Sequence, residues 1–185
     1  MKEKLKDIVK FYSGLIISRE KTSLQSKVHY DVLNYKSLAD YVNIDLNKLE
    51  KVYTKEDVNI KYITKKNDII LKLVYPFKAI LISEKESGIL ITSNFCKIIC
   101  SDKVLPEYLI ACLNSEKIDK KLKVESKNQS VNQISIKDLE NVEIELYDIQ
   151  KQKIIARLYN DYLKKIQLTK KILEKEQKII KNIYK

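Results

Sequence analysis

The segment NQISIKDLENVEIELYDIQKQKIIARL, residues 132–158, combines two different periods of apolar residues. Val142, Ile144 and Leu146 alternate with polar side chains, which is typical of a half-buried strand. From Ile154 onward the apolar residues recur at helical spacing, and neither glycine nor proline separates the two patterns. The sequence therefore predicts a strand that closes the globular part of the chain and continues directly into a helix.

The predicted helix, residues 149–185, carries apolar side chains in a seven-residue repeat. One row is Tyr159, Ile166, Leu173 and Ile180, and the other is Ile155, Tyr162, Thr169, Glu176 and Ile183. About 36 residues of helix are roughly 54 Å long, which exceeds the diameter of a small domain. The apolar members of both rows are therefore expected to pair with a second helix in a coiled coil, and the polar Thr169 and Glu176 are expected to weaken the seam while setting its register. The alternative is a helix that folds back along its own domain.

The chain before this helix mixes strand and helix patterns. Strands are expected over 5–14 and 28–38, on both sides of a turn at 65–68, in a hairpin over 78–101 whose turn is EKESG, and over 140–146. Helices are expected over 45–53, over 105–122 with Pro106 in the first turn, and as a single turn over 135–139. We therefore predict an α+β (mixed α/β) domain over residues 1–147, followed by one long coiled-coil helix over 148–185.

Charge gives the first indication of a partner. The net charge is +11, and residues 149–185 hold eleven basic side chains against three acidic ones. Such an excess attracts polyanions, although a solvated lysine-rich helix face would look the same. The N-terminal residues lack the apolar core of a signal peptide, and no apolar run is long enough to span a bilayer. We therefore expect a cytoplasmic protein without a membrane partner, whose three cysteines are reduced thiols.

Catalytic motifs are missing from the sequence. The two glycines, Gly14 and Gly88, are isolated, so they cannot form the glycine-rich turn that nucleotide cofactors require. His29 is the single histidine, and it lies in a strand pattern. Asp119 followed by Glu125-Ser-Lys127 resembles a nuclease pattern, but such triplets arise by chance in a chain rich in Glu and Lys. We therefore predict no enzyme, no metal site and no cofactor in this chain, with a nuclease as a weak alternative.

The order of short motifs resembles the end of a target-recognition domain in the specificity (S) subunits of type I restriction-modification systems. A polar loop, QIS, DL, a strand and a Gln-x-x-Ile-Ala helix start follow one another, through Gln133, Ile134, Ser135, Asp138, Leu139, Gln152, Ile155 and Ala156. Upstream, LKDIVKFYSG, NDIILKLVYPFKAILI and LPEYLIACLNS are similar to the opening strand, the central strand and the helix of that family. The sequence departs from the family at turns: Lys6 and Asn67 replace a usual glycine, and Tyr147-Asp148 replaces a usual proline pair.

Full S subunits hold two recognition domains and two long helices, so the chain looks like a half-size S subunit. The resemblance implies antiparallel pairing of the helices in a homodimer, so that two domains each read half of a bipartite site on double-stranded DNA. It also implies docking of methyltransferase (M) subunits, which carry S-adenosylmethionine, and of a restriction (R) subunit. A detached DNA-specificity domain of a type II methyltransferase-endonuclease and a coiled-coil scaffold without a nucleic-acid role are the alternatives.

Candidate DNA contacts lie in three expected loops, 18–27, 72–78 and 126–133. Lysine and arginine suit phosphates, whereas arginine, asparagine, glutamine and serine suit base edges. The favoured residues are Arg19, Lys21, Gln25, Tyr75, Lys78, Lys127, Asn128 and Gln129. Arg19 stands out because the chain contains only one other arginine, Arg157, and a planar guanidinium can bind guanine at two atoms. Each of these side chains could also be an ordinary exposed polar residue.

Overall fold

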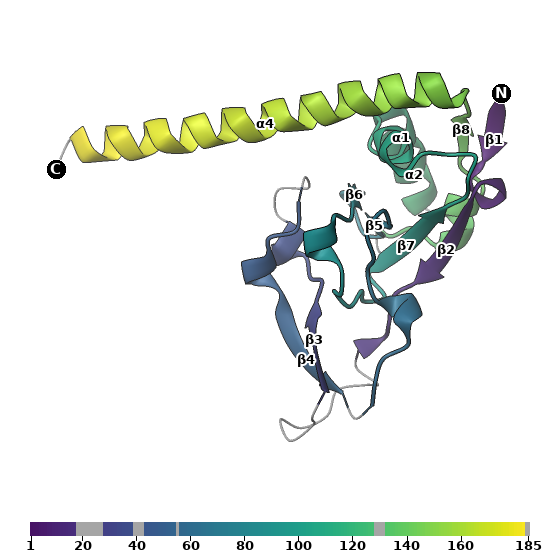
Figure 1. Cartoon of the computed structure of the whole chain (residues 1–185), viewed down its shortest axis with the longest axis horizontal. Helices are drawn as coiled ribbons and strands as arrows, with labels where there is room; N and C mark the ends of the chain where they lie inside the picture. The colour runs from purple at the N-terminus through teal and green to yellow at the C-terminus, as the bar shows by residue number, and fades with distance from the viewer. Residues whose placement is uncertain (18–27, 39–42, 55, 128–131, 184–185) are drawn as a thin grey trace.

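The computed structural model consists of a mixed α+β body at one end of a long helix (Figure 1). It describes residues 1–17, 28–38, 43–54, 56–127 and 132–183. The predicted fold class, an α+β body followed by one long C-terminal helix, is confirmed. The predicted homodimer through that helix remains a prediction, because the structure contains a single chain.

The centre of the body is a four-stranded antiparallel sheet with the strand order β2 (Val9–Ser13), β7 (Phe95–Cys100), β5 (Ile69–Lys72) and β6 (Ala79–Leu81). β5 lies between two partners, so its residues are buried on both faces of the sheet. Helices α1 (Pro106–Leu113), α2 (Glu116–Ser126) and α3 (Ile136–Glu140) complete this part of the body. Apolar side chains from these helices and from the sheet form the largest core cluster, including Leu71, Ile98 and Leu109.

The predicted closing strand is confirmed as β8 (Glu143–Glu145), which pairs antiparallel with β1 (Lys2–Lys4). Val142 and Ile144 are buried, as their alternation with glutamates predicted. Tyr108 of α1 donates a hydrogen bond from its hydroxyl to the carbonyl of Glu145. The first and last strands of the body are therefore joined beside the start of the long helix.

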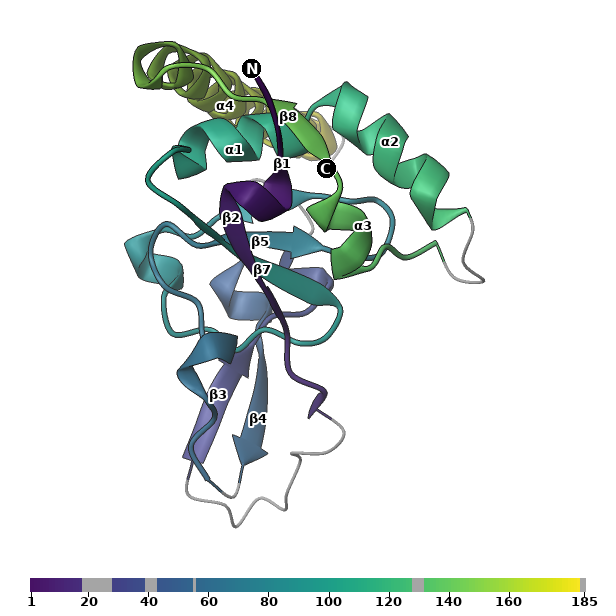
Figure 2. The same ribbon diagram turned by 90° about the vertical axis from the view of Figure 1, so that its right-hand side faces the viewer.

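Besides the central sheet and the β1–β8 pair, β3 (Val28–Val32) and β4 (Glu50–Thr54) form a two-stranded ribbon at the end of the body away from the long helix (Figure 2). The helix predicted over 45–53 is wrong beyond its first turn. Leu46–Lys48 forms a 3-10 turn, capped by the Asp45 carboxylate, and the chain then extends into β4. Pairing with β3 overrides the helical propensity of this segment, because propensity is weaker than tertiary pairing.

The predicted hairpin over 78–101 is also wrong, because β5 separates β6 from β7 in the sheet. The hairpin of this region joins β5 to β6, with Ile69 opposite Leu81. The EKESG segment contains a 3-10 turn at Glu84–Glu86, in which the Glu86 carboxylate accepts hydrogen bonds from Ser83. The strand expected before the turn at 65–68 is a 3-10 turn at Ile60–Tyr62.

Two departures from the S-subunit pattern have a structural explanation. Asn67 takes a φ of 70°, a left-handed conformation in which glycine is favoured and asparagine is tolerated. Asp148 precedes the long helix, and its carboxylate accepts a hydrogen bond from the Lys151 amide at 2.9 Å, which is the role of a helix N-cap. Both substitutions therefore preserve the local turn.

The segment predicted as one helix over 105–122 forms two helices, because the helical conformation is interrupted at Asn114 and Ser115. Asn114 uses its side chain to bind the backbone of Ala79 in β6, with hydrogen bonds of 2.9 Å and 2.8 Å. Ser115 then caps α2 by accepting a hydrogen bond from the Ile118 amide. The single turn predicted over 135–139 is confirmed as α3, where Ser135 and the third residue of the helix form a capping box.

The long helix α4 (Ile149–Ile183) has 35 residues, of which the first turns pack on α1. Gln152 and Ala156 are its buried residues, and from Leu168 to Ile183 every residue is exposed. The helix therefore packs closely on its own body only over its first turns, and its middle passes the segment before β4 across a cleft. Among the described helices, none is long and apolar enough to cross a membrane.

Candidate nucleic-acid interface

Two of the three candidate loops lie side by side on the body. The Tyr75 amide donates a hydrogen bond to the Asn132 carbonyl at 2.9 Å, and the Ile134 amide donates to the Leu73 carbonyl at 2.9 Å. An isolated bridge between Val74 and Gln133 joins the same segments. The loops 72–78 and 126–133 are far apart in the sequence, and this backbone pairing joins the first to the described end of the second.

Tyr75 is the most prominent side chain of this surface, with 45% of its area exposed. Its ring packs edge-on against Phe77, with 5.7 Å between the ring centroids. The Lys123 ammonium lies 4.9 Å from the centre of the Tyr75 ring, and it also pairs with the Asp119 carboxylate at 2.6 Å. The bond to Asp119, and then that to Tyr75, raise the pKa of Lys123, so its positive charge is retained at neutral pH.

Lys127 and Lys78 flank this surface with different degrees of exposure. Lys127 is exposed directly after α2, whereas Lys78 is half-buried and its carbonyl accepts a hydrogen bond from the Lys72 amide. Lys123 was not predicted as a contact, although its position in the last turn before a polar loop could have indicated it. An exposed aromatic ring with ammonium groups beside it is suited to stacking and to phosphate contact.

Five predicted contacts cannot be placed on this surface. Arg19, Lys21 and Gln25 in the first loop, and Asn128 and Gln129 in the third, lie outside the described residues. The described segment before the first loop is tightly packed, because a Cβ on Gly14 would lie 2.0 Å from the Thr92 carbonyl oxygen. The direction in which the chain leaves β2 is thus set by the glycine.

The β3–β4 ribbon presents a second polar surface, which was not among the predicted sites. His29 pairs with Tyr53 across the ribbon, with 6.0 Å between the ring centroids, and Asp31 pairs with Lys51. His29, Asp31 and Lys51 are exposed, whereas Val52 on the opposite face of the ribbon is buried. Apolar and polar side chains alternate over residues 28–32, and this pattern could have indicated that one face of the ribbon is exposed. A two-stranded ribbon has dimensions that the major groove of DNA accepts.

Lys97 and Asp68 form a buried ion pair beneath the sheet, with 3.6 Å between ammonium and carboxylate. The Lys97 ammonium also donates to the Ile63 carbonyl at 2.8 Å, and Asp68 accepts a hydrogen bond from the Lys65 amide. Burial lowers the pKa of Lys97 and raises the pKa of Asp68. Because Lys97 is only 3% exposed, this pair holds the turn before β5 in place and is out of reach of a bound macromolecule.

The described residues contain no group of three or more His, Cys, Asp or Glu side chains that could hold a metal ion. Cys96 is buried, and Cys100 and Cys112 are half-buried free thiols. Burial raises the pKa of Cys96 and of Cys100 to about 12, so both thiols stay protonated at neutral pH.

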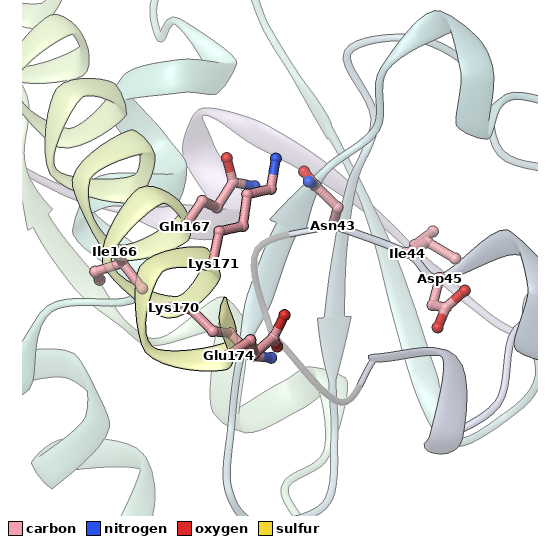
Figure 3. A pocket seen from close by; sticks show the side chains of 8 residues that line it. All are labelled: Asn43, Ile44, Asp45, Ile166, Gln167, Lys170, Lys171 and Glu174. Carbon is pink, nitrogen blue, oxygen red and sulfur yellow. The ribbon is translucent and has the colours of Figure 1, made fainter. Parts of the chain in front are cut away.

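A cleft of about 340 Å³ lies between α4 and the segment before β4 (Figure 3). Its walls are Asn43, Ile44 and Asp45 on one side and Ile166, Gln167, Lys170, Lys171 and Glu174 on the other. Gln167 and Lys171 point from the helix toward Asn43 (Figure 3). The cleft separates the middle of α4 from the body, and its mixed charges do not form an arrangement of acid and base groups suited to catalysis.

The predicted dimerisation residues divide into two groups along α4. Ile155 and Tyr159 are partly buried against the core of their own body, and the Tyr159 hydroxyl accepts a hydrogen bond from the Asn114 amide group. The others are exposed, by between 39% for Ile166 and 68% for Ile183: Tyr162, Ile166, Leu173, Ile180 and Ile183. Further exposed apolar side chains widen the stripe, namely Ile154, Leu158, Leu168, Ile172 and Ile179.

The α+β body on a long helix is the fold of solved S subunits. The chain is similar to the HsdS subunit from Thermoanaerobacter tengcongensis (TM-score 0.59, 16% identity) and to the type I restriction-modification S subunit from M. genitalium (0.61, 15%). It is also similar to a chain of a structure described as showing complex assembly and conformational transition of the type I R-M system (0.60, 16%). Each comparison covers 96% of this chain, but only 39%, 42% and 40% of the respective solved chain.

The family described as the type I restriction modification DNA specificity domain matches residues 1–176. The chain therefore belongs to this family, as its motif order predicted. The family is one of specificity domains, in agreement with the prediction of a component that is not an enzyme. No curated protein matches the chain.

Proposed function

We propose that the chain is the DNA sequence-specificity component of a type I restriction-modification complex. The observation that carries this proposal is the joining of loops 72–78 and 126–133 into one polar surface on the body of a specificity-domain fold. Tyr75, Lys123 and Lys127 supply an exposed ring and positive charge there. The β3–β4 ribbon, with His29 and Lys51 on its exposed face, contributes a second reading surface for the major groove.

Two copies of the chain pair through α4, so that two bodies read the two halves of a bipartite site on double-stranded DNA. The support for this step is the continuous apolar stripe, whose members from Tyr162 to Ile183 are exposed in the single chain. An exposed apolar surface of this length on a helix calls for a partner, and a second α4 has the same repeat. Residues 1–147 are then the recognition domain and 148–185 the spacer.

Catalysis in this complex belongs to the partners. Methyltransferase subunits bring S-adenosylmethionine and the transfer chemistry, a restriction subunit brings cleavage, and the assembly works in the cytoplasm. The chain itself supplies sequence choice, because its described residues offer phosphate-binding and base-reading groups without a cofactor loop.

The test combines genetics with purified protein. Deleting the gene for this chain should remove one bipartite methylated motif from the host genome, and tagged protein should co-purify with a methyltransferase subunit. Retention of every methylated motif after the deletion would refute the proposal. A contiguous lost motif would instead favour a specificity domain of a type II enzyme, and metal-dependent cleavage by the chain alone would favour a nuclease. DNA binding that is absent at low salt would favour a scaffold.

A further inference from the structure

A second cleft, of about 270 Å³, opens beside the start of α4. It lies between α1, α2, β8 and α4, and its walls are mainly apolar or aromatic: Tyr108, Cys112, Ile118, Ile144, Tyr147 and Ile155. Nothing in the described part of the chain fills it. The entry of an aliphatic side chain into a cleft with such walls is favourable, because it removes apolar surface from water.

The cleft is continuous with the apolar stripe of α4. Ile155 contributes to both, since it lines the cleft and begins the row that continues with Tyr162 and ends with Ile183. A helix that pairs with the stripe along its whole length must therefore pass the mouth of the cleft at its far end. Only an antiparallel partner places its C-terminal end there.

We propose that this cleft receives the C-terminal end of α4 from a second copy of the chain, with Ile183 as the inserted side chain. The inference rests on the proposed dimer and adds to it a contact between the helix end of one copy and the body of the other. Each copy would donate one helix end and accept one, as an isologous interface requires.

The seven-residue repeat supports this register. In an antiparallel pair, Ile155 opposite Ile180 of the second copy also brings Tyr162 opposite Leu173, while the polar Glu176 and Thr169 face Tyr159 and Ile166. The same register places Ile183 beside the first turn of the facing helix. Ile183 then lies opposite residue 152, which is three residues or about 4.5 Å nearer the N-terminus of the facing helix than Ile155, a residue that lines the cleft.

The charges around the cleft match the end of α4. Glu143 and Glu145 of β8 line it, and Lys181 occupies the last turn of the incoming helix. The hydrogen bond from Tyr147, and then the charge of Lys117, lower the pKa of Glu145, so its carboxylate is ionised at neutral pH. Lys117 also lines the cleft, and its ammonium lies 3.8 Å from the Glu145 carboxylate.

A native thiol in the cleft permits a direct test. Ile183→Cys in the full chain should form a disulfide with Cys112 of the second copy under a mild oxidant at alkaline pH, giving a covalent dimer on a non-reducing gel. The covalent dimer should disappear when Cys112→Ser is added. Lys178→Cys is the matched control, because it places a thiol on the same end of α4 but away from the stripe, and it should not cross-link.

Each alternative outcome contradicts the inference in a recognisable way. A cross-link that survives Cys112→Ser would mean that two helix ends meet each other, as in parallel pairing. A dimer by light scattering that never cross-links would refute the cleft contact and leave the proposed dimer intact, whereas a monomer would refute both. Ala111→Trp, which fills the cleft from α1, should in addition raise the dimer dissociation constant by roughly ten- to a hundredfold through loss of one aliphatic burial; an unchanged constant would oppose the inference.

Discussion

Replacing Gln152 by leucine should destabilise the protein, because this side chain joins α4 to the body. Gln152 has no exposed area, and its amide makes three hydrogen bonds to backbone groups. Its nitrogen donates to the carbonyls of Lys103 at 3.0 Å and Tyr147 at 2.8 Å, and its oxygen accepts from the Leu105 amide at 2.8 Å. Leucine has a similar size but leaves these three groups without a partner.

The expected loss follows from these contacts. A typical hydrogen bond contributes about 0.5–1.5 kcal/mol, and a buried group left unpaired costs about 1–3 kcal/mol, while leucine gains part of this back through apolar burial. We therefore expect a decrease of about 2–4 kcal/mol in the free energy of unfolding. For a chain of this size the decrease corresponds to a fall in Tm of roughly 5–15 °C.

The assay is thermal and urea unfolding of the full chain at fixed protein concentration, since dimer formation would otherwise shift the midpoint. Gln150→Leu is the matched control, because Gln150 lies in the same turn and is exposed. It should change the free energy of unfolding by less than about 0.5 kcal/mol. Equal midpoints for Gln152→Leu and the wild type would refute the reasoning that these hydrogen bonds hold the helix to the body.

Four further predictions concern the proposed function. Leu173→Glu should convert the dimer to a monomer in light scattering, whereas Lys171→Glu should not; a surviving Leu173→Glu dimer would place the interface elsewhere. Arg19→Lys, on sequence grounds alone, should weaken binding to the cognate duplex by about 1–3 kcal/mol and leave a scrambled duplex unaffected; equal losses would make Arg19 a phosphate contact. Lys127→Ala should weaken binding to both duplexes alike and reduce the slope of log affinity against log salt by about one. His29→Ala should lower cognate binding more than scrambled binding, and no change on either duplex would remove the ribbon from the interface.

Local chemistry explains which parts of the fold were predictable from the sequence. α3 is stabilised locally, because Ser135 and Asp138 form its capping box, and α4 was predicted because its apolar repeat extends over many turns. The hairpin over 78–101 was mispredicted because pairing is non-local. Ile69, on the central strand β5, pairs with Leu81 of β6 on one side and with Ile98 of β7 on the other. No local sequence pattern distinguishes this strand order from a simple hairpin of β6 and β7.

The candidate site was predictable to the same extent. The sequence identified loops 72–78 and 126–133 as candidates, but the backbone pairing of residues 73–75 with residues 132–134, which joins them, is visible only in the structure. The ribbon was missed because a helical signal after Asp45 hid the strand that pairs with His29. Local patterns therefore indicate which residues are available for binding, whereas long-range pairing decides which of them share a surface.

The way α4 is attached suits the proposed role of a spacer. The hydrogen bonds of Gln152 and Tyr159 fix the first turns on the body, and from Leu168 to Ile183 the side chains are exposed. A helix of 35 residues is about 52 Å long, so a tilt of 10° at its base would displace its far end by about 9 Å. That displacement corresponds to between two and three base pairs at about 3.4 Å each. In the proposed dimer such an error would bring the second body over the wrong bases, so the stiffness of the attachment matters as much for site selection as the residues that read the bases.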